Sequence, residues 1–207
     1  MPGRRVPRAG LSRQAVTTAA LDVIDAGGTT GFGTLTLASV AGQVGVAVPS
    51  LYKHVASLTD LRRSVAILCV TEFTATIESA AIGRAGSEAL RAVAHAMRAF
   101  ATAHPGRYAA TQVAADPADP ADAELAAASA ATLTALARVL RGFDLPADLT
   151  VEAIRIMRSA LHGFIVLELG GGFKLPDDLD RSFELLVTIV IAGIDTLAAG
   201  IDALTVE

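Results

Sequence analysis

Tyr52, Lys53 and His54 are three consecutive polar residues whose side chains suit a polyanionic partner. A hydroxyl, an ammonium and an imidazole can each donate a hydrogen bond, and phosphate and sugar oxygens receive at least half of the hydrogen bonds that proteins make to DNA. The group therefore predicts contact with a nucleic-acid backbone. The alternatives are that Tyr52 packs as an aromatic residue with an exposed hydroxyl and that Lys53 and His54 are merely solvated.

Catalytic or metal-binding chemistry has no comparable arrangement in the sequence. The histidines lack the spacing of metal ligands, no G-x-S-x-G segment occurs, and the single cysteine, Cys69, lies in an apolar stretch and excludes an internal disulfide. His162 and Glu168 are too far apart to share one helix face, so we expect His162 to be a core or interface residue hydrogen-bonded to the backbone. We predict no catalytic residue, no metal ligand and no cofactor.

The segment from Thr36 to Leu61 contains the elements that would position the polar group. Thr36 can cap a short helix, and Gly45 can adopt the left-handed conformation of a sharp turn. The buried face of that helix has helical spacing and comprises Leu37, Val40, Ala41 and Val44. A second short helix follows to about His54, with Pro49 in its first turn. Two short helices joined by a tight turn match a helix-turn-helix, which places its second helix in a DNA major groove.

The second helix of this unit should have an apolar inner face, with its start exposed to DNA. Val46, Leu51 and Val55 would face inward. The exposed start is poor in hydrogen-bond donors. Either it makes apolar contacts with thymine methyl groups, or the helix reads its site with weak specificity. The residues that we predict to contact DNA are Arg4, Arg5, Arg8, Thr36, Ala47, Val48, Pro49, Ser50, Tyr52, Lys53 and His54.

Charge is distributed unevenly along the chain. Residues 1–65 hold seven Lys/Arg against three Asp/Glu, a balance of +4, whereas the remaining residues balance at −8. A basic head on an acidic body favours a polyanion that meets only the head. Arg4, Arg5 and Arg8 could form an arm along a groove of DNA. The alternatives are chance clustering of charge and a tail that contacts nothing.

The whole chain is predicted to be all-α. Its 207 residues are 52% hydrophobic and 4% aromatic, which suits close-packed helices, and the breaks between apolar stretches contain Gly or Pro. Ser57 and Asp60 form a capping box at the start of the fourth helix. Nine helices are expected, at about 12–26, 36–44, 46–54, 57–80, 87–103, 106–114, 120–141, 147–169 and 179–199, with a glycine- and threonine-rich loop at 29–34.

Compartment and membrane contact also follow from the sequence. One cysteine and a charged N-terminus without a following apolar run favour the cytoplasm and no signal peptide. The apolar stretch 185–194 is too short to span a bilayer, so no membrane partner is predicted.

The helix-turn-helix segment resembles the recognition-helix motif of TetR-family transcriptional regulators. The resemblance rests on Gly45-Val46, on Ser50 to Val55 and on Leu61, and it covers about a quarter of the chain. Ala47, Val48, Val55 and Leu58 depart from the usual pattern. The resemblance implies an N-terminal three-helix DNA-binding domain at 1–62 and a C-terminal helical bundle at 63–207 for ligand binding and dimerisation.

The C-terminal part resembles a domain type named for a Trp-His-Gly motif, with Leu161 in place of the tryptophan before His162 and Gly163. Such bodies bind a small molecule and dimerise, which the apolar character of the last helix permits. Residues expected at a pocket, or else in plain core, are Met97, Phe100, His104, Tyr108, Gln112, Met157, Leu161 and His162. Residues expected at the dimer interface, or else in the centre of a monomer, are Phe164, Leu167, Phe183, Leu186, Val187, Val190, Ile191 and Ile194.

The resulting functional prediction is a ligand-responsive transcriptional repressor. A homodimer would bind a palindromic operator, and a small, largely apolar effector would move the fourth helix and separate the two heads from successive major grooves. The first alternative is a helical adaptor that binds proteins and carries a degenerate DNA-binding head. The second and weaker alternative is an all-α enzyme.

Overall fold

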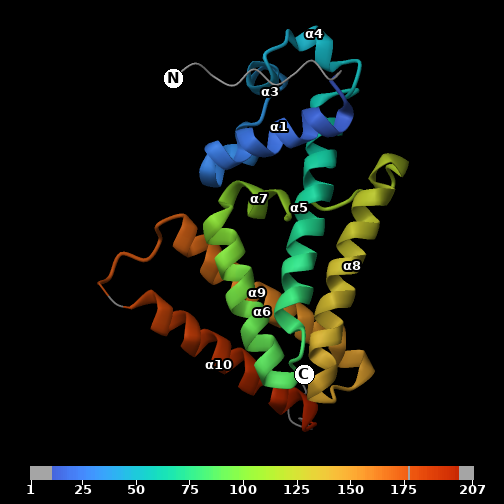
Figure 1. Cartoon of the computed structure of the whole chain (residues 1–207). Coiled ribbons are helices and arrows are strands. Elements are labelled where there is room, and N and C mark those ends of the chain that lie inside the picture. Colours follow the sequence, from blue (N-terminus) through green and yellow to red (C-terminus); the bar gives the residue numbers. More distant parts are fainter. Residues whose placement is uncertain (1–10, 177, 201–207) are drawn as a thin grey trace.

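The computed structural model describes residues 11–176 and 178–200, and within these residues the chain forms ten α-helices and no strand. The predicted all-α class, a helix-turn-helix unit followed by a helical bundle, is confirmed. Figure 1 shows the small N-terminal head at one end and the long helix α5 running from the head into the body.

The head is built from four helices, two of which begin at a side-chain cap. They are α1 (Arg13–Ala26), α2 (Gly31–Thr34), α3 (Leu37–Val44) and α4 (Val48–Leu51). Ser12 caps α1 by accepting a hydrogen bond from the Ala15 N–H at 3.1 Å. Thr36 and Ser39 form a reciprocal capping box at the start of α3. These caps satisfy N–H groups that a helix leaves free at its N-terminus.

The loop predicted at 29–34 is instead helical. Residues Gly28–Thr30 form a 3-10 turn and lead directly into α2. A Cβ added at Gly31 would lie 2.1 Å from the carbonyl oxygen of Ile24, so only glycine lets this turn rest against α1. Phe32 is half-buried against the head core. Glycine was expected here as a loop former, whereas in the structure it permits close helix packing.

Helix α5 (Leu58–Ala81) belongs to both cores. Leu61, Val65 and Cys69 are fully buried in the head core, while Phe73 and Ile77 lie in the body core. The head core therefore continues beyond residue 62, where the sequence placed the domain boundary. Burial raises the pKa of Cys69 to about 12, so this thiol stays protonated and unreactive at neutral pH.

The body consists of five further helices around an apolar core. They are α6 (Gly86–Ala103), α7 (Pro105–Ala110), α8 (Ala123–Leu140), α9 (Thr150–Leu169) and α10 (Leu179–Ala198). Helix α7 ends at Ala110 rather than at the predicted 114, and the chain then runs without a helix to the 3-10 turn Pro120–Asp122. The remaining predicted helices agree with the structure to within a few residues.

Two stretches, Leu58–Ala81 and Pro120–Phe143, are long and apolar enough to cross a membrane by length and composition alone, each with a mean hydropathy of 1.3. Both contribute buried side chains to the clusters of the helical fold. Packing between helices accounts for their apolar composition, as in the central helices of other bundles.

Head and body meet along α1 and α7. A Cβ added at Gly106 would lie 2.4 Å from the carbonyl oxygen of Ile24, so the two backbones touch without an intervening side chain. Arg107 binds Asp25 of α1 at 2.6 Å and Glu72 of α5 at 2.9 Å. Ala110 of α7 is buried in the head core. The junction is thus closed by apolar packing, backbone contact and ion pairs together.

Candidate nucleic-acid interface

The turn between α3 and α4 has the geometry of a helix-turn-helix. Gly45 ends α3 in the left-handed conformation, with φ 72° and ψ 34°, and the Val46 N–H donates to the Ala41 carbonyl at 3.0 Å. This hydrogen bond closes the end of α3 in the way typical of glycine-terminated helices. Leu51 and Val55 are buried as predicted, whereas Val46 is only half-buried against the head core.

Helix α4 is shorter than predicted. The α-helix ends at Leu51, and a turn continues to Val55 because the N–H groups of His54 and Val55 both donate to the Leu51 carbonyl, at 2.8 and 3.0 Å. The segment therefore still presents one helical surface, with its last turn less regular than the sequence suggested.

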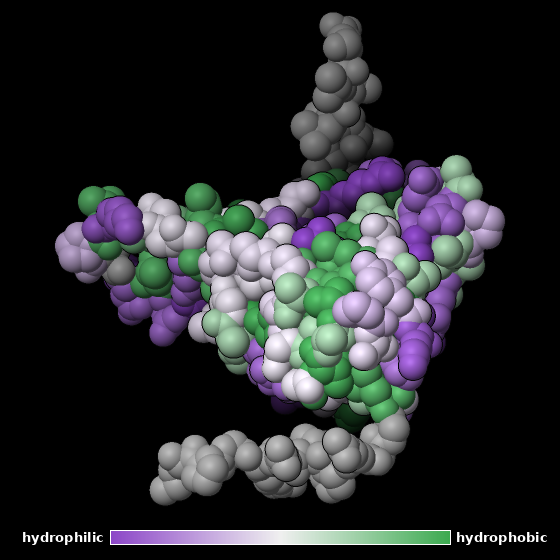
Figure 2. Space-filling view, turned by 90° about the horizontal axis from the view of Figure 1, so that it is seen from above, coloured by the Kyte–Doolittle hydropathy of each residue, from purple (hydrophilic) through white to green (hydrophobic). Residues whose placement is uncertain are grey.

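The structure places the described members of the predicted DNA-contacting set at or near the surface. Tyr52 is 56% exposed. Those exposed are Thr36, Ala47, Pro49, Tyr52 and Lys53, and those half-buried are Val48, Ser50 and His54. Figure 2 looks down on this end of the molecule and shows nearly neutral and apolar residues over its centre, with hydrophilic residues toward its sides. The middle of this surface is accordingly less hydrophilic than its sides.

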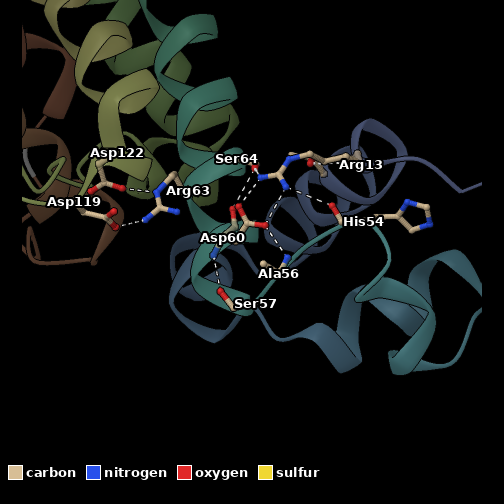
Figure 3. A network of polar contacts seen from close by, with 10 residues as sticks. Arg13, His54, Ala56, Ser57, Asp60, Arg63, Ser64, Asp119 and Asp122 are labelled. Atoms are coloured by element: carbon tan, nitrogen blue, oxygen red, sulfur yellow. Dashed lines mark hydrogen bonds and ion pairs between the residues drawn. The ribbon is translucent and has the colours of Figure 1, made fainter.

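Arg13 holds the helix-turn-helix against the long helix. Its guanidinium binds the Asp60 carboxylate at 2.6 and 3.0 Å and also donates to the Ser64 hydroxyl at 2.7 Å and the His54 carbonyl at 3.4 Å (Figure 3). The hydrogen bond from Arg13 is the main cause that holds the pKa of Asp60 below its ordinary value. The backbone that follows α4 is therefore fixed to both α1 and α5.

Asp60 takes a different part in capping from the one predicted. Ser57 accepts from the Asp60 N–H at 3.0 Å, which is half of the expected capping box. The Asp60 carboxylate accepts from the Ala56 N–H at 2.8 Å and from Arg13, not from the Ser57 N–H. Sequence reasoning missed Arg13, because the 47 residues that separate it from Asp60 carry no local pattern.

Most basic side chains in the described part of the head are used internally. Arg62 donates to the carbonyls of Gly33 and Leu35, and Arg63 binds Asp119 and Asp122. Of the four Lys/Arg between residues 11 and 65, only Lys53 makes no hydrogen bond or ion pair to the described residues. The predicted arm residues Arg4, Arg5 and Arg8 lie outside the described residues.

The body contains a cavity of about 360 Å³ between helices α5 to α9 and the segment after α7. Three of the predicted pocket residues, Met97, Tyr108 and Gln112, line it. The others do not: Phe100, His104, Met157, Leu161 and His162. The lining residues that sequence reasoning missed are Val70, Phe73, Thr111, Val113, Ala114, Ala115, Ser129, Thr132, Leu133, Leu136 and Arg158.

The five predicted pocket residues that do not line this cavity lie in other surroundings. Met157 and Leu161 are fully buried in the body core, and Phe100 packs against it. His104 is partly exposed, about 4.0 Å from Asp25. His162 is hydrogen-bonded through Nδ1 to the Tyr108 hydroxyl at 2.9 Å, a side-chain partner rather than the expected backbone one.

The predicted interface residues are divided by the structure into core and surface. Five are buried in the chain's own core: Phe183, Val187, Val190, Ile191 and Ile194. Phe164 and Leu186 are half-buried, and Leu167 is exposed. The apolar residues exposed on α9 and α10 are Val151, Ile156, Val166, Leu167, Leu185 and Ile189.

Comparison with known proteins adds three sequence relationships. A family model described as "Tetracyclin repressor-like, C-terminal domain" matches residues 90–190. An HTH-type transcriptional regulator of Mycobacterium tuberculosis is 35% identical over 188 residues, covering 89% of this chain and 82% of that protein. The HTH-type transcriptional regulator YobS of Bacillus subtilis is 27% identical over 188 residues, covering 91% of this chain and 95% of that protein.

Solved structures share the fold. A protein from Rhodococcus sp. RHA1 superposes with a TM-score of 0.72 at 21% identity, covering 92% of this chain and 98% of that one. ActR from Streptomyces coelicolor, a TetR family protein solved in complex with (S)-DNPA, superposes with a TM-score of 0.63 at 20% identity, covering 92% of this chain and 100% of that one. Both similarities extend over head and body.

Proposed function

The chain belongs to the TetR family of transcriptional regulators, and from this premise we propose that it is a homodimeric repressor released from a palindromic operator by a small effector. Members of this family regulate transcription and are not enzymes, so the prediction that the chain is not an enzyme is confirmed. The Trp-His-Gly subtype is part of the proposal and rests on the sequence from Leu161 to Gly163 alone.

The observation that carries the proposal is the surface formed by α4 and its last turn. Tyr52 and Lys53 are exposed beside a helix start whose own side chains are small. In the proposed complex these two residues bind phosphates, while Ala47, Val48 and Pro49 meet base edges through apolar contact. Arg13 and Asp60 support this geometry because they fix the chain that leaves α4.

Dimerisation is proposed to use the exposed apolar side chains of α9 and α10. Leu167 and Ile189 are more than half exposed in the single chain, and further large apolar side chains of the same two helices are exposed as well. Exposed apolar residues that lie together mark interaction sites, whereas single ones are common on any surface. Gly163 and Gly193 have open space where a Cβ would stand, so a partner helix could approach closely. A two-fold axis at this face would present two heads to half-sites about 34 Å apart.

Coupling between effector and DNA is proposed to pass through the segment after α7. Residues 111–115 line the cavity, and the same segment continues to Asp119 and Asp122, which hold Arg63 near the start of α5. Arg63 lies three residues after Asp60, the partner of Arg13. An effector that displaces the cavity wall would therefore bias the position of α5 and, through it, of the head.

The adaptor alternative keeps one supporting observation, the lack of side-chain hydrogen-bond donors at Ala47 and Val48. The repressor proposal has more support, since exposed Tyr52 and Lys53 suit phosphate rather than protein. As a DNA-binding protein, the chain is proposed to act in the cytoplasm.

Selection of bound duplexes from a random pool by the purified full-length protein tests the proposal. We expect a two-fold symmetric sequence with half-sites about one helical turn apart, and affinity that falls steeply with salt. Lys53→Ala should reduce the slope of log K against log salt by about 1, whereas Lys174→Ala, in the loop before α10, should leave it unchanged. Absence of any enriched symmetric site would instead favour the adaptor.

A further inference from the structure

The walls of the body cavity are mainly apolar. Val70 and Phe73 of α5 and Leu136 of α8 are buried beside it, and Leu133 is partly exposed at its edge. Such walls suit the hydrocarbon part of a small molecule, and about 360 Å³ falls within the range of small-molecule sites.

One charged side chain, Arg158 of α9, lines this cavity, and no Asp or Glu does so among the described lining residues. Arg158 is an exposed residue at this cavity, and its guanidinium donates one hydrogen bond, to the Gln112 side-chain oxygen at 3.2 Å. No carboxylate of the described residues forms an ion pair with it. A guanidinium carries five N–H groups in a planar fork that fits a carboxylate, so most of its donors have no partner from the described protein atoms.

Two other arginines of the body, Arg98 and Arg107, show what Arg158 lacks. Arg98 binds Glu168 at 2.6 Å and Asp180 at 2.8 Å, and Arg107 binds Asp25 and Glu72. These side chains are fully engaged in holding helices together. Arg158 has no such structural task that the described residues reveal, although it lines an apolar cavity.

The positive charge of Arg158 affects the pKa values of two nearby groups, Tyr108 and His162. Burial is the main cause that raises the pKa of Tyr108 to about 12, and Arg158 opposes that rise. Burial, followed by Arg158, lowers the pKa of His162, whose ring nitrogen is bonded to the Tyr108 hydroxyl. Both groups are therefore uncharged at neutral pH, and neither supplies a counter-charge to the arginine.

We propose that the effector is an amphipathic monocarboxylate, with its apolar body between α5 and α8 and its carboxylate on Arg158. This rests on the proposed function, since it names the ligand class of the same effector site. A single arginine matches a single negative charge in both charge and fork geometry. Ligands with several phosphates are disfavoured, because no second cation lines the cavity.

Matched ligands test the charge requirement on the full-length protein without DNA. The probes are octanoate with octan-1-ol and 4-phenylbutanoate with 4-phenylbutan-1-ol, plus octylammonium, all measured by calorimetric titration. We expect at least one acid to bind roughly tenfold more tightly than its alcohol, as suits one charge-assisted pair, and octylammonium to bind least.

Two arginine variants identify the group responsible. Arg158→Gln should remove the preference for acid over alcohol and leave alcohol binding unchanged, which also demonstrates that the variant is folded. Arg155→Gln is the matched control, because Arg155 lies on the same helix, is exposed and is outside the cavity lining. Equal binding of acid and alcohol, stronger binding of octylammonium, no binding of either acid, or an acid preference that survives Arg158→Gln would each overturn the proposal.

Failure of this inference can be told apart from failure of the proposed function. Operator release is measured separately, by adding the acids to the complex of protein and selected DNA. Acid binding through Arg158 without release would support the ligand class and remove effector control from the proposed function. Operator binding without any acid preference would leave the DNA-binding proposal in place and overturn the ligand class alone.

Discussion

Arg13 and Asp60, separated by 47 residues in the sequence, form a bidentate ion pair that joins the first turn of α1 to the first turn of α5. The Asp60 carboxylate also accepts from the Ala56 N–H at 2.8 Å. Two charged partners and one backbone group thus meet where the chain leaves the helix-turn-helix, so the angle between α4 and α5 depends on this pair.

Replacing Asp60 tests that dependence. Asp60→Asn should destabilise the protein by about 1 kcal/mol, a modest value because Arg13 is half exposed and the pair is screened by solvent. Operator affinity should fall by more than this loss of stability explains, since the folded fraction hardly changes. Urea unfolding and DNA titration at the same temperature measure the two effects. Unchanged operator affinity would show that α4 is oriented without the pair.

The acid side of the stability profile provides an independent check of the same pair. The pKa of Asp60 is lowered in the folded state, mainly by Arg13, so the stability that its ionised form contributes is fully present above the unfolded-state pKa of about 3.9. That contribution is lost as the pH falls from there through the folded-state pKa. Between pH 5 and pH 3 the melting temperature of the native protein should therefore fall further than that of Asp60→Asn.

Gly45 and Gly42 form a matched pair within the helix-turn-helix. Gly45→Ala should destabilise the protein by about 1–2 kcal/mol, because an L-residue is strained at φ 72° although no atom blocks its Cβ. Gly42→Ala should stabilise it by about 0.5–1 kcal/mol, since Gly42 lies within α3, with open space around it and helical backbone angles. Chemical denaturation of both variants measures the difference, and a loss of stability in both would contradict it.

Ile189 tests the proposed dimer face. It is 67% exposed on α10, so Ile189→Glu should leave the helix content of the chain unchanged. Burying the introduced charge should weaken the dimer by roughly a hundredfold, which corresponds to about 2.7 kcal/mol. Sedimentation equilibrium measures the change. Ile82→Glu, at a residue that is 74% exposed and outside α9 and α10, serves as the control and should not alter the dimer.

Arg63 tests the route from cavity to head. Arg63→Gln should free the segment that ends at Asp122, whose carboxylate also accepts from the Asp116 N–H. Amide exchange should accelerate from residue 116 to residue 122, and operator release by an acid that binds the native protein should require more ligand. Arg84→Gln, at an exposed pair with Glu88, is the control. Release unaffected by Arg63→Gln would place the coupling elsewhere.

Local sequence patterns predicted the parts of the fold that are determined locally. Thr36 and Gly45 begin and end α3 as expected, because capping and left-handed turns depend on residues only a few positions apart. The same reasoning failed at Gly31, whose role is to let α2 approach Ile24, a contact that no local pattern encodes.

The cavity and the interface were harder to predict for the same reason. Residues 111–115 have the composition of a helix but leave helical geometry after Ala110 and become a cavity wall. The sequence of α10 is apolar on nearly all sides of the helix, which indicated that the helix is buried. It did not indicate which face of the helix packs within the chain. The structure assigns Phe183 and Val187 to the core and leaves Leu185 and Ile189 exposed. Only tertiary packing distinguishes these faces.

The bare backbone contact between Gly106 and Ile24 has a consequence for engineering and evolution. Suppose that residues 1–62 are exchanged for the corresponding DNA-binding domain of a homologous regulator. The foreign α1 would then pack against an α7 that does not match it. A successful chimera must transplant α7 together with the N-terminal helices, although some forty residues of α5 and α6 separate them along the gene.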